Sequence, residues 1–78
     1  MDAATEPIKL SGLAVSLQRL REAKGWSRET LAHHAGLSFA AIAQLETCRR
    51  QDPRLSTLVA LARALEVSLD ELVRGYLG

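Results

Sequence analysis

Three serines in this chain stand at the same kind of boundary. Each has an apolar residue directly before it and another four positions after it: Trp26 and Leu31 flank Ser27, Leu37 and Ile42 flank Ser38, and Val67 and Leu72 flank Ser68. A serine N-cap with these two neighbours is typical of a helix start closed by a hydrophobic staple. The chain is therefore expected to fold into several short helices with brief connections.

The first predicted helix lies before these serines. Leu13, Leu17 and Leu20 recur at helical spacing and predict a helix over about residues 11–24, with Ser11 as its N-cap. Gly25 follows, and a glycine commonly ends a helix because it adopts a left-handed conformation without steric cost.

Four further helices are predicted after Gly25. They run from Arg28 to Ala35, from Ser38 to about residue 47 or 48, from a cap at Ser56, and from a capping box formed by Ser68 and Glu71. Residues 1–9 are expected to be a disordered tail, and residues 10–78 a single domain.

Size and composition restrict how this domain can be stabilised. Among 78 residues Cys48 is the only cysteine, so no internal disulfide can form, and its spacing from His33 and His34 does not suit a zinc site. Apolar residues make up 47% but aromatic residues only 4%, which favours an aliphatic helical core over a sheet. We expect an all-α protein without metal or cofactor.

The location of the protein follows from two features of the same sequence. No apolar run is long enough to span a membrane, and the polar, acidic start does not resemble a signal peptide. We therefore expect a cytoplasmic protein with no membrane partner, which suits an unpaired thiol.

The stretch from residue 28 to 47 is the most informative part of the chain. Its two predicted helices are separated only by a turn around Gly36, which a glycine permits at positive φ. Ala32 supplies a small side chain where helices this close must cross. The residues expected to face inward are Leu31, Ala35, Leu37, Ile42 and Leu45. This is the pattern of a helix-turn-helix.

Together these motifs resemble the lambda-repressor-like, Cro-like (XRE) DNA-binding domains over about residues 11–74. The segments that carry the resemblance are Leu20-Arg21-Glu22-Ala23-Lys24-Gly25-Trp26-Ser27, Leu31-Ala32-His33-His34-Ala35-Gly36-Leu37-Ser38, Ile42-Ala43-Gln44-Leu45-Glu46, Pro53-Arg54-Leu55-Ser56-Thr57-Leu58, and residues 62–72. The resemblance implies a five-helix domain that binds double-stranded DNA.

In such a domain the helix that begins at Ser38 would enter the major groove. The base-contacting residues implied are Ser38, Phe39, Ala40 and Gln44, and the phosphate-contacting residues are Ser27, Arg28, Thr47, Arg49 and Arg50. Gln44 is the only long polar side chain on the outward face and can pair bidentately with adenine. Phe39 and Ala40 have no donors, although the family often has polar residues there. For Phe39, groove contact and packing both remain open.

Four other residues have local interpretations. Glu46 is expected to bond the loop or a neighbouring arginine instead of DNA, because its carboxylate repels phosphate. Trp26 is expected to be a staple residue, and His33 and His34 to be solvated. Cys48 stands where the family commonly has glycine, so either the helix runs one turn further or Cys48 is strained.

The C-terminal segment has more apolar residues than one inward stripe needs. We expect a symmetric homodimer whose interface includes Leu72, Val73, Tyr76 and Leu77. The predicted function is sequence-specific transcription regulation at a palindromic operator, with RNA polymerase as a further candidate partner.

Several related functions remain open at this stage. Restriction–modification controller proteins, small phage repressors and antitoxins are all similar in size and shape. A protein-interaction module with the same fold is the other alternative. No nucleophile, base and orienting group can be assembled, so an enzyme is not expected.

Overall fold

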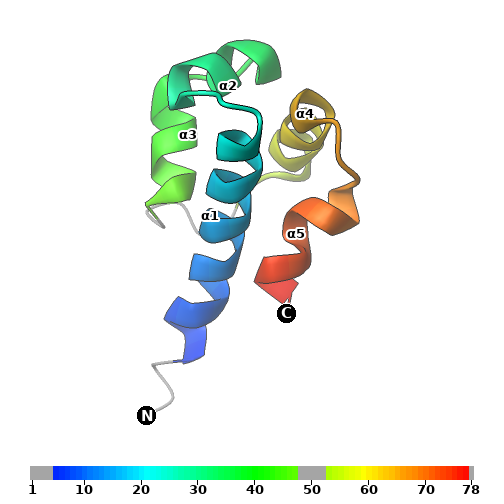
Figure 1. Cartoon of the computed structure of the whole chain (residues 1–78). Helices are drawn as coiled ribbons and strands as arrows, with labels where there is room; N and C mark the ends of the chain where they lie inside the picture. The colour runs from blue at the N-terminus through cyan, green and yellow to red at the C-terminus, as the bar shows by residue number, and fades with distance from the viewer. Residues whose placement is uncertain (1–4, 48–52, 78) are drawn as a thin grey trace.

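Five α-helices make up the described part of the chain. The computed structural model describes residues 5–47 and 53–77, with side chains described over residues 12–47 and 53–73. The helices are α1 (Thr5–Ala23), α2 (Arg28–Ala35), α3 (Phe39–Glu46), α4 (Leu55–Leu65) and α5 (Leu69–Leu77). Figure 1 shows α1 passing between α3 on one side and α4 and α5 on the other. The predicted all-α, five-helix architecture is confirmed.

Serine caps begin three of these helices, as the sequence predicts. The Ser27 hydroxyl accepts a hydrogen bond from the Thr30 amide at 3.1 Å, and the Ser38 hydroxyl accepts one from the Ala41 amide at 3.0 Å. The Ser68 hydroxyl accepts from the Glu71 amide at 2.9 Å. Each bond satisfies a backbone donor that the first turn of a helix leaves unpaired.

Two predicted helix starts are wrong. Helix α1 begins at Thr5, so residues 5–9 are helical and not part of a disordered tail, and Ser11 is not an N-cap. Pro7 does not prevent this, because a proline in the first turn loses an N–H that has no helical partner. Helix α4 begins at Leu55 after Arg54, which has extended backbone angles and no side-chain acceptor for a cap. Ser56 therefore lies inside the first turn.

Left-handed residues end α2 and α4. Gly36 has φ of 70°, and the Leu37 amide donates back to the Ala32 carbonyl at 2.9 Å. The same reversal follows α4, where Glu66 has φ of 59° and the Val67 amide donates to the Ala62 carbonyl at 3.0 Å. This hydrogen bond closes the Schellman type of helix end. The tight turn predicted between α2 and α3 is confirmed.

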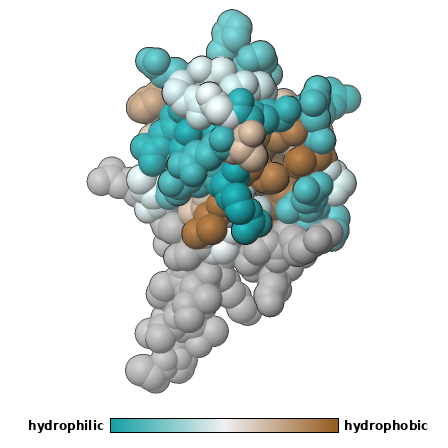
Figure 2. Space-filling model, in the orientation of Figure 1, coloured by the Kyte–Doolittle hydropathy of each residue, from teal (hydrophilic) through white to brown (hydrophobic). Residues whose placement is uncertain are grey.

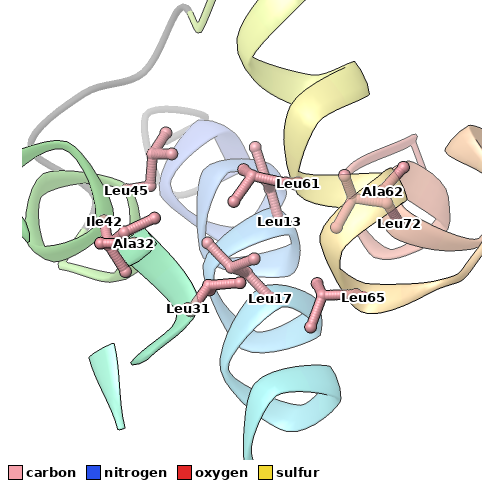
Figure 3. Close-up of a cluster of buried hydrophobic side chains, with 10 residues drawn as sticks. All are labelled: Leu13, Leu17, Leu31, Ala32, Ile42, Leu45, Leu61, Ala62, Leu65 and Leu72. Carbon is pink, nitrogen blue, oxygen red and sulfur yellow. The ribbon is translucent and has the colours of Figure 1, made fainter. Parts of the chain in front are cut away.

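One aliphatic cluster joins all five helices (Figure 3). Its members are Leu13, Leu17, Leu31, Ala32, Ile42, Leu45, Leu61, Ala62, Leu65 and Leu72. Trp26, Ala35, Leu37 and Leu58 pack against it in partly buried positions, which confirms the predicted inward faces and the staple role of Trp26. Within the described ranges, no helix is both long enough and apolar enough to cross a membrane.

Leu72 corrects the predicted dimer interface. Its side chain is 0% exposed because α5 turns it into the domain's own core, so a second subunit cannot reach it in this fold. Val73 is half-buried and also packs against the core cluster. The side chains of Tyr76 and Leu77 lie outside the described residues.

Replacing Ala32 by leucine tests the helix crossing. Ala32 is buried in the core cluster, so we expect Ala32→Leu to overpack it and to lower the free energy of unfolding by about 1–3 kcal/mol. Thermal or urea unfolding measures this change. Ala23→Leu adds the same atoms at an exposed position and serves as the control. Equal stability of the two variants would contradict the crossing described here.

Candidate nucleic-acid interface

Helix α3 has two chemically different faces. Ile42 and Leu45 point into the core cluster. The opposite face carries a shallow hollow of about 390 Å³ lined by Phe39, Ala40, Ala43, Gln44 and Thr47. These positions share one side of the helix because they are spaced three and four residues apart. Three of the four predicted base-contacting residues, Phe39, Ala40 and Gln44, therefore lie together on one surface, and Thr47 lies beside them.

Gln44 is the polar group of this hollow with hydrogen-bonding capacity to spare. Its amide makes no hydrogen bond to any other described residue, and its side chain is partly buried. The Thr47 hydroxyl instead donates to the Ala43 carbonyl at 2.7 Å, so its hydrogen is already used within the helix. The Gln44 amide can supply both a donor and an acceptor to a ligand.

The starts of α2 and α3 place two predicted contact residues at helix N-termini. Ser27 and Ser38 precede these helices with extended backbone angles, and both are exposed. Helix N-termini attract anions through unpaired amides and the helix dipole. The Ser38 hydroxyl can donate to a phosphate or a base while its oxygen accepts the capping bond. The Ser27 hydroxyl also shares a hydrogen bond of 3.0 Å with the Thr30 hydroxyl, and it can donate to a phosphate when Thr30 is the donor of that bond. Arg49 and Arg50, the phosphate contacts predicted after the C-terminal end of α3, lie outside the described residues, as does Cys48.

A buried carboxylate beside this surface joins three helices. The Glu46 side chain is 0% exposed and receives two hydrogen bonds from Arg21, at 2.7 Å from Nε and 2.9 Å from Nη2. Arg21 Nη1 also donates to the Trp26 carbonyl at 2.7 Å. These bonds to Glu46 raise the pKa of the Arg21 guanidinium above its ordinary value, so it remains charged. The expectation that Glu46 bonds a neighbouring arginine is confirmed.

Arg28 is the second arginine on this carboxylate. Its Nε donates to Glu46 Oε1 at 2.9 Å, while its side chain remains 36% exposed. Neither terminal nitrogen of Arg28 has a hydrogen bond within the described part of the chain. The guanidinium is thus held along one edge and open along the other. A partly anchored arginine of this kind is well suited to bind a phosphate oxygen.

His34 is exposed, as predicted, and its ring also makes a packing contact. Its ring stacks on Trp26 with centroids 4.3 Å apart and 3° between the planes, and Lys24 Nζ lies 5.2 Å from the Trp26 ring centroid. Lys24 also pairs with Glu66 at 3.3 Å. Among the described residues, no three His, Cys, Asp or Glu side chains group as metal ligands would. The stack therefore belongs to the packing of the turn before α2.

Figure 2 shows the face of the molecule seen in Figure 1. Its surface is largely hydrophilic, with an apolar area on the side of α4. Leu55 and Val59 are large exposed apolar residues on that helix, at i and i+4. On α3, Phe39 is likewise a large exposed apolar residue, with 51% of its surface exposed.

The comparisons with known proteins agree on one architecture. A helix-turn-helix family model matches residues 17–72. The restriction–modification controller protein C.AhdI from Aeromonas hydrophila is 36% identical, with 81% of this chain and 94% of that chain covered and a TM-score of 0.77. The hypothetical transcription factor NHTF from Neisseria is 32% identical, with 87% and 75% covered and a TM-score of 0.79. No curated protein matches significantly.

A third solved structure extends this similarity. It is a mutant of the restriction–modification controller protein C.Esp1396I, 28% identical, with 85% of this chain and 88% of that chain covered and a TM-score of 0.74. The region matched by the family model, residues 17–72, contains α2, the turn and α3, and so includes the described candidate interface.

Removing the charge of Glu46 tests the clamp. We expect Glu46→Gln to lower the free energy of unfolding by about 3–5 kcal/mol, because the buried Arg21 charge loses its partner. Denaturant unfolding measures the loss. Glu22→Gln makes the same chemical change at an exposed carboxylate 4.0 Å from Arg21, and should cost less than about 1 kcal/mol. A similar cost for both variants would remove the special role of Glu46.

Proposed function

Since the chain belongs to the helix-turn-helix family, we propose that it regulates transcription by binding a specific sequence of double-stranded DNA through α3. The observation that carries this proposal is the exposed face of α3, where an amide with free hydrogen-bonding capacity lies beside an open hollow. An α-helix of this kind fits the major groove of DNA.

The base-contacting set comprises Ser38, Phe39, Ala40 and Gln44. Gln44 pairs through its amide with the N6 and N7 positions of an adenine. Ser38, at the N-terminus of α3, offers a hydroxyl to a base edge, and the two apolar residues contact base edges without hydrogen bonds. Direct readout by hydrogen bonds is therefore concentrated in Gln44.

The phosphate-contacting set comprises Ser27, Arg28, Arg49 and Arg50. Thr47 is left out of it, because both its hydroxyl and its backbone N–H donate to the Ala43 carbonyl. Arg28 is supported by its open guanidinium edge and Ser27 by its place at the start of α2. Contacts of this kind fix the register of the protein on the duplex without reading sequence. They also make affinity depend on salt, because each neutralised phosphate releases counterions.

One such domain covers only half of a two-fold operator, so we infer a symmetric dimer on a palindromic site. Its interface would use Val73, Tyr76 and Leu77 near the end of α5, without Leu72. The similarity to two restriction–modification controller proteins favours the genes of a restriction–modification system as the regulated target. A methylase and a nuclease encoded beside this chain would support that assignment.

Selection of bound sequences from random duplex DNA tests the function. We expect an enriched palindromic motif whose affinity falls as salt rises. Gln44→Ala should weaken binding to that motif by about 1–3 kcal/mol and relax the preference at one base pair in each half-site. Equal losses on specific and random DNA would exclude Gln44 from base readout. An absence of salt-dependent DNA binding would instead favour a protein-interaction module.

Sedimentation at micromolar concentration tests the dimer. We expect the wild-type chain to sediment as a dimer and Leu77→Asp to shift it toward monomer, because a charge at an apolar interface must be desolvated. Leu55→Asp makes the same substitution at an exposed position of α4 and is a control for the change in charge. A wild-type monomer that Leu77→Asp leaves unchanged would overturn this interface.

A further inference from the structure

The hollow on α3 is apolar where a base-reading surface is usually polar. Phe39, Ala40 and Ala43 line it and carry no side-chain donor or acceptor. The hydroxyl hydrogen of Thr47 is committed to the Ala43 carbonyl. Among the described residues that line the hollow, only the Gln44 side chain is left to donate to a ligand. The hydrogen-bond code of the major groove can thus be read at only one point of this surface.

The bases differ in what they show to such a surface. In the major groove guanine offers two acceptors, adenine offers an acceptor and a donor, and cytosine offers a donor. Thymine offers one acceptor and a C5-methyl group, the only apolar group on any unmodified base edge. An apolar hollow leaves the polar atoms of the other bases without partners, and this costs free energy on desolvation.

We propose that the α3 hollow binds the C5-methyl group of a thymine whose paired adenine is read by Gln44. This inference rests on the proposed function and names the DNA that it recognises. Phe39 supplies most of the contact area, since its ring is 51% exposed and no described part of the domain covers it further. Ala40 and Ala43 are small enough to let the edge of the base approach the helix.

Placement of the hollow determines why thymine is chosen over a methylated cytosine. Gln44 lies in the same hollow as the three apolar residues, so its amide and the apolar surface can contact the two bases of one pair. Its bidentate pairing prefers adenine. A T·A pair offers a methyl group to the apolar residues and an adenine to the Gln44 amide. A C·G pair offers a methyl group only when its cytosine is methylated, and it offers no adenine.

The test uses the full chain and the motif obtained by selection from random DNA. Each thymine of the motif is replaced in turn by deoxyuridine, which lacks only the C5-methyl group. At the contacted thymine we expect affinity to fall about fourfold in one half-site and about fifteenfold when both half-sites are changed. Uniform affinities across all these duplexes would overturn the proposal.

A second arm separates the methyl group from the base that carries it. At the contacted position, T·A is replaced by C·G or by 5-methylcytosine paired with guanine. We expect the methylated pair to bind about fourfold more tightly than C·G and less tightly than T·A. Equal binding of the two cytosine duplexes would show that the methyl group is not read. A methylated pair that equals T·A would overturn the role given to Gln44.

Protein variants assign the effect to the hollow. In Phe39→Ala the penalty for deoxyuridine should disappear within error, whatever the variant's overall affinity. Leu55→Ala also removes a large exposed apolar side chain, 66% exposed on α4, and should keep the full penalty. Thermal melting confirms that both variants fold. A penalty that persists in Phe39→Ala would exclude Phe39 as the methyl-contacting residue.

Failure of this inference is distinguishable from failure of the proposed function. A chain that selects no DNA sequence fails as a regulator. A chain that selects a motif but binds its deoxyuridine form equally well remains a regulator, and only the methyl contact is then wrong.

Discussion

The arrangement of α1, α2 and α3 depends on one buried carboxylate. Glu46 is at the end of α3, Arg21 is near the end of α1, and Arg28 is the first residue of α2. Removing such charges from water is costly unless each is fully paired. Here every buried side-chain polar atom of the described residues has a partner. The pairing requires the ends of α1 and α3 and the start of α2 to lie close together, so it favours this placement over packings of the aliphatic core that would leave the carboxylate unpaired.

The same carboxylate connects the core to the proposed DNA surface. Arg28 touches Glu46 with one edge of its guanidinium and has the other edge open. The hydrogen bond to buried Glu46 therefore fixes the orientation of the Arg28 guanidinium. An arginine held in this way loses less conformational freedom on binding phosphate than a freely rotating one. Glu46 thus holds both α3, the helix proposed to read DNA, and the neighbouring Arg28 in place.

Local patterns predicted most of this fold, because the information is local. Serine caps and the glycine after α2 act within a few residues, and the caps at Ser27, Ser38 and Ser68 and the turn at Gly36 lie where the sequence predicts. The start of α4 was missed because Ser56 looks like a cap, although helical geometry already begins at Leu55. The start of α1 at Thr5 was not predicted, because the apolar spacing of Leu13, Leu17 and Leu20 does not extend to these residues, although the first turn of a helix tolerates Pro7.

Contacts between distant segments were harder to predict. The partner of Glu46 was expected to be an arginine, but the choice of Arg21 depends on how α1 crosses α3. The stack of Trp26 and His34 likewise depends on the turn before α2. Leu72 was predicted at a dimer interface, but the packing of α5 on the other helices buries it in the core.

None of the five residues that line the α3 hollow belongs to the buried cluster or packs against it. Stability and the proposed sequence preference thus depend on different positions of the same eight-residue helix. An engineer can exchange the reading residues as a set and keep the scaffold. Over generations, a chain of this design can acquire a new operator without first losing its fold.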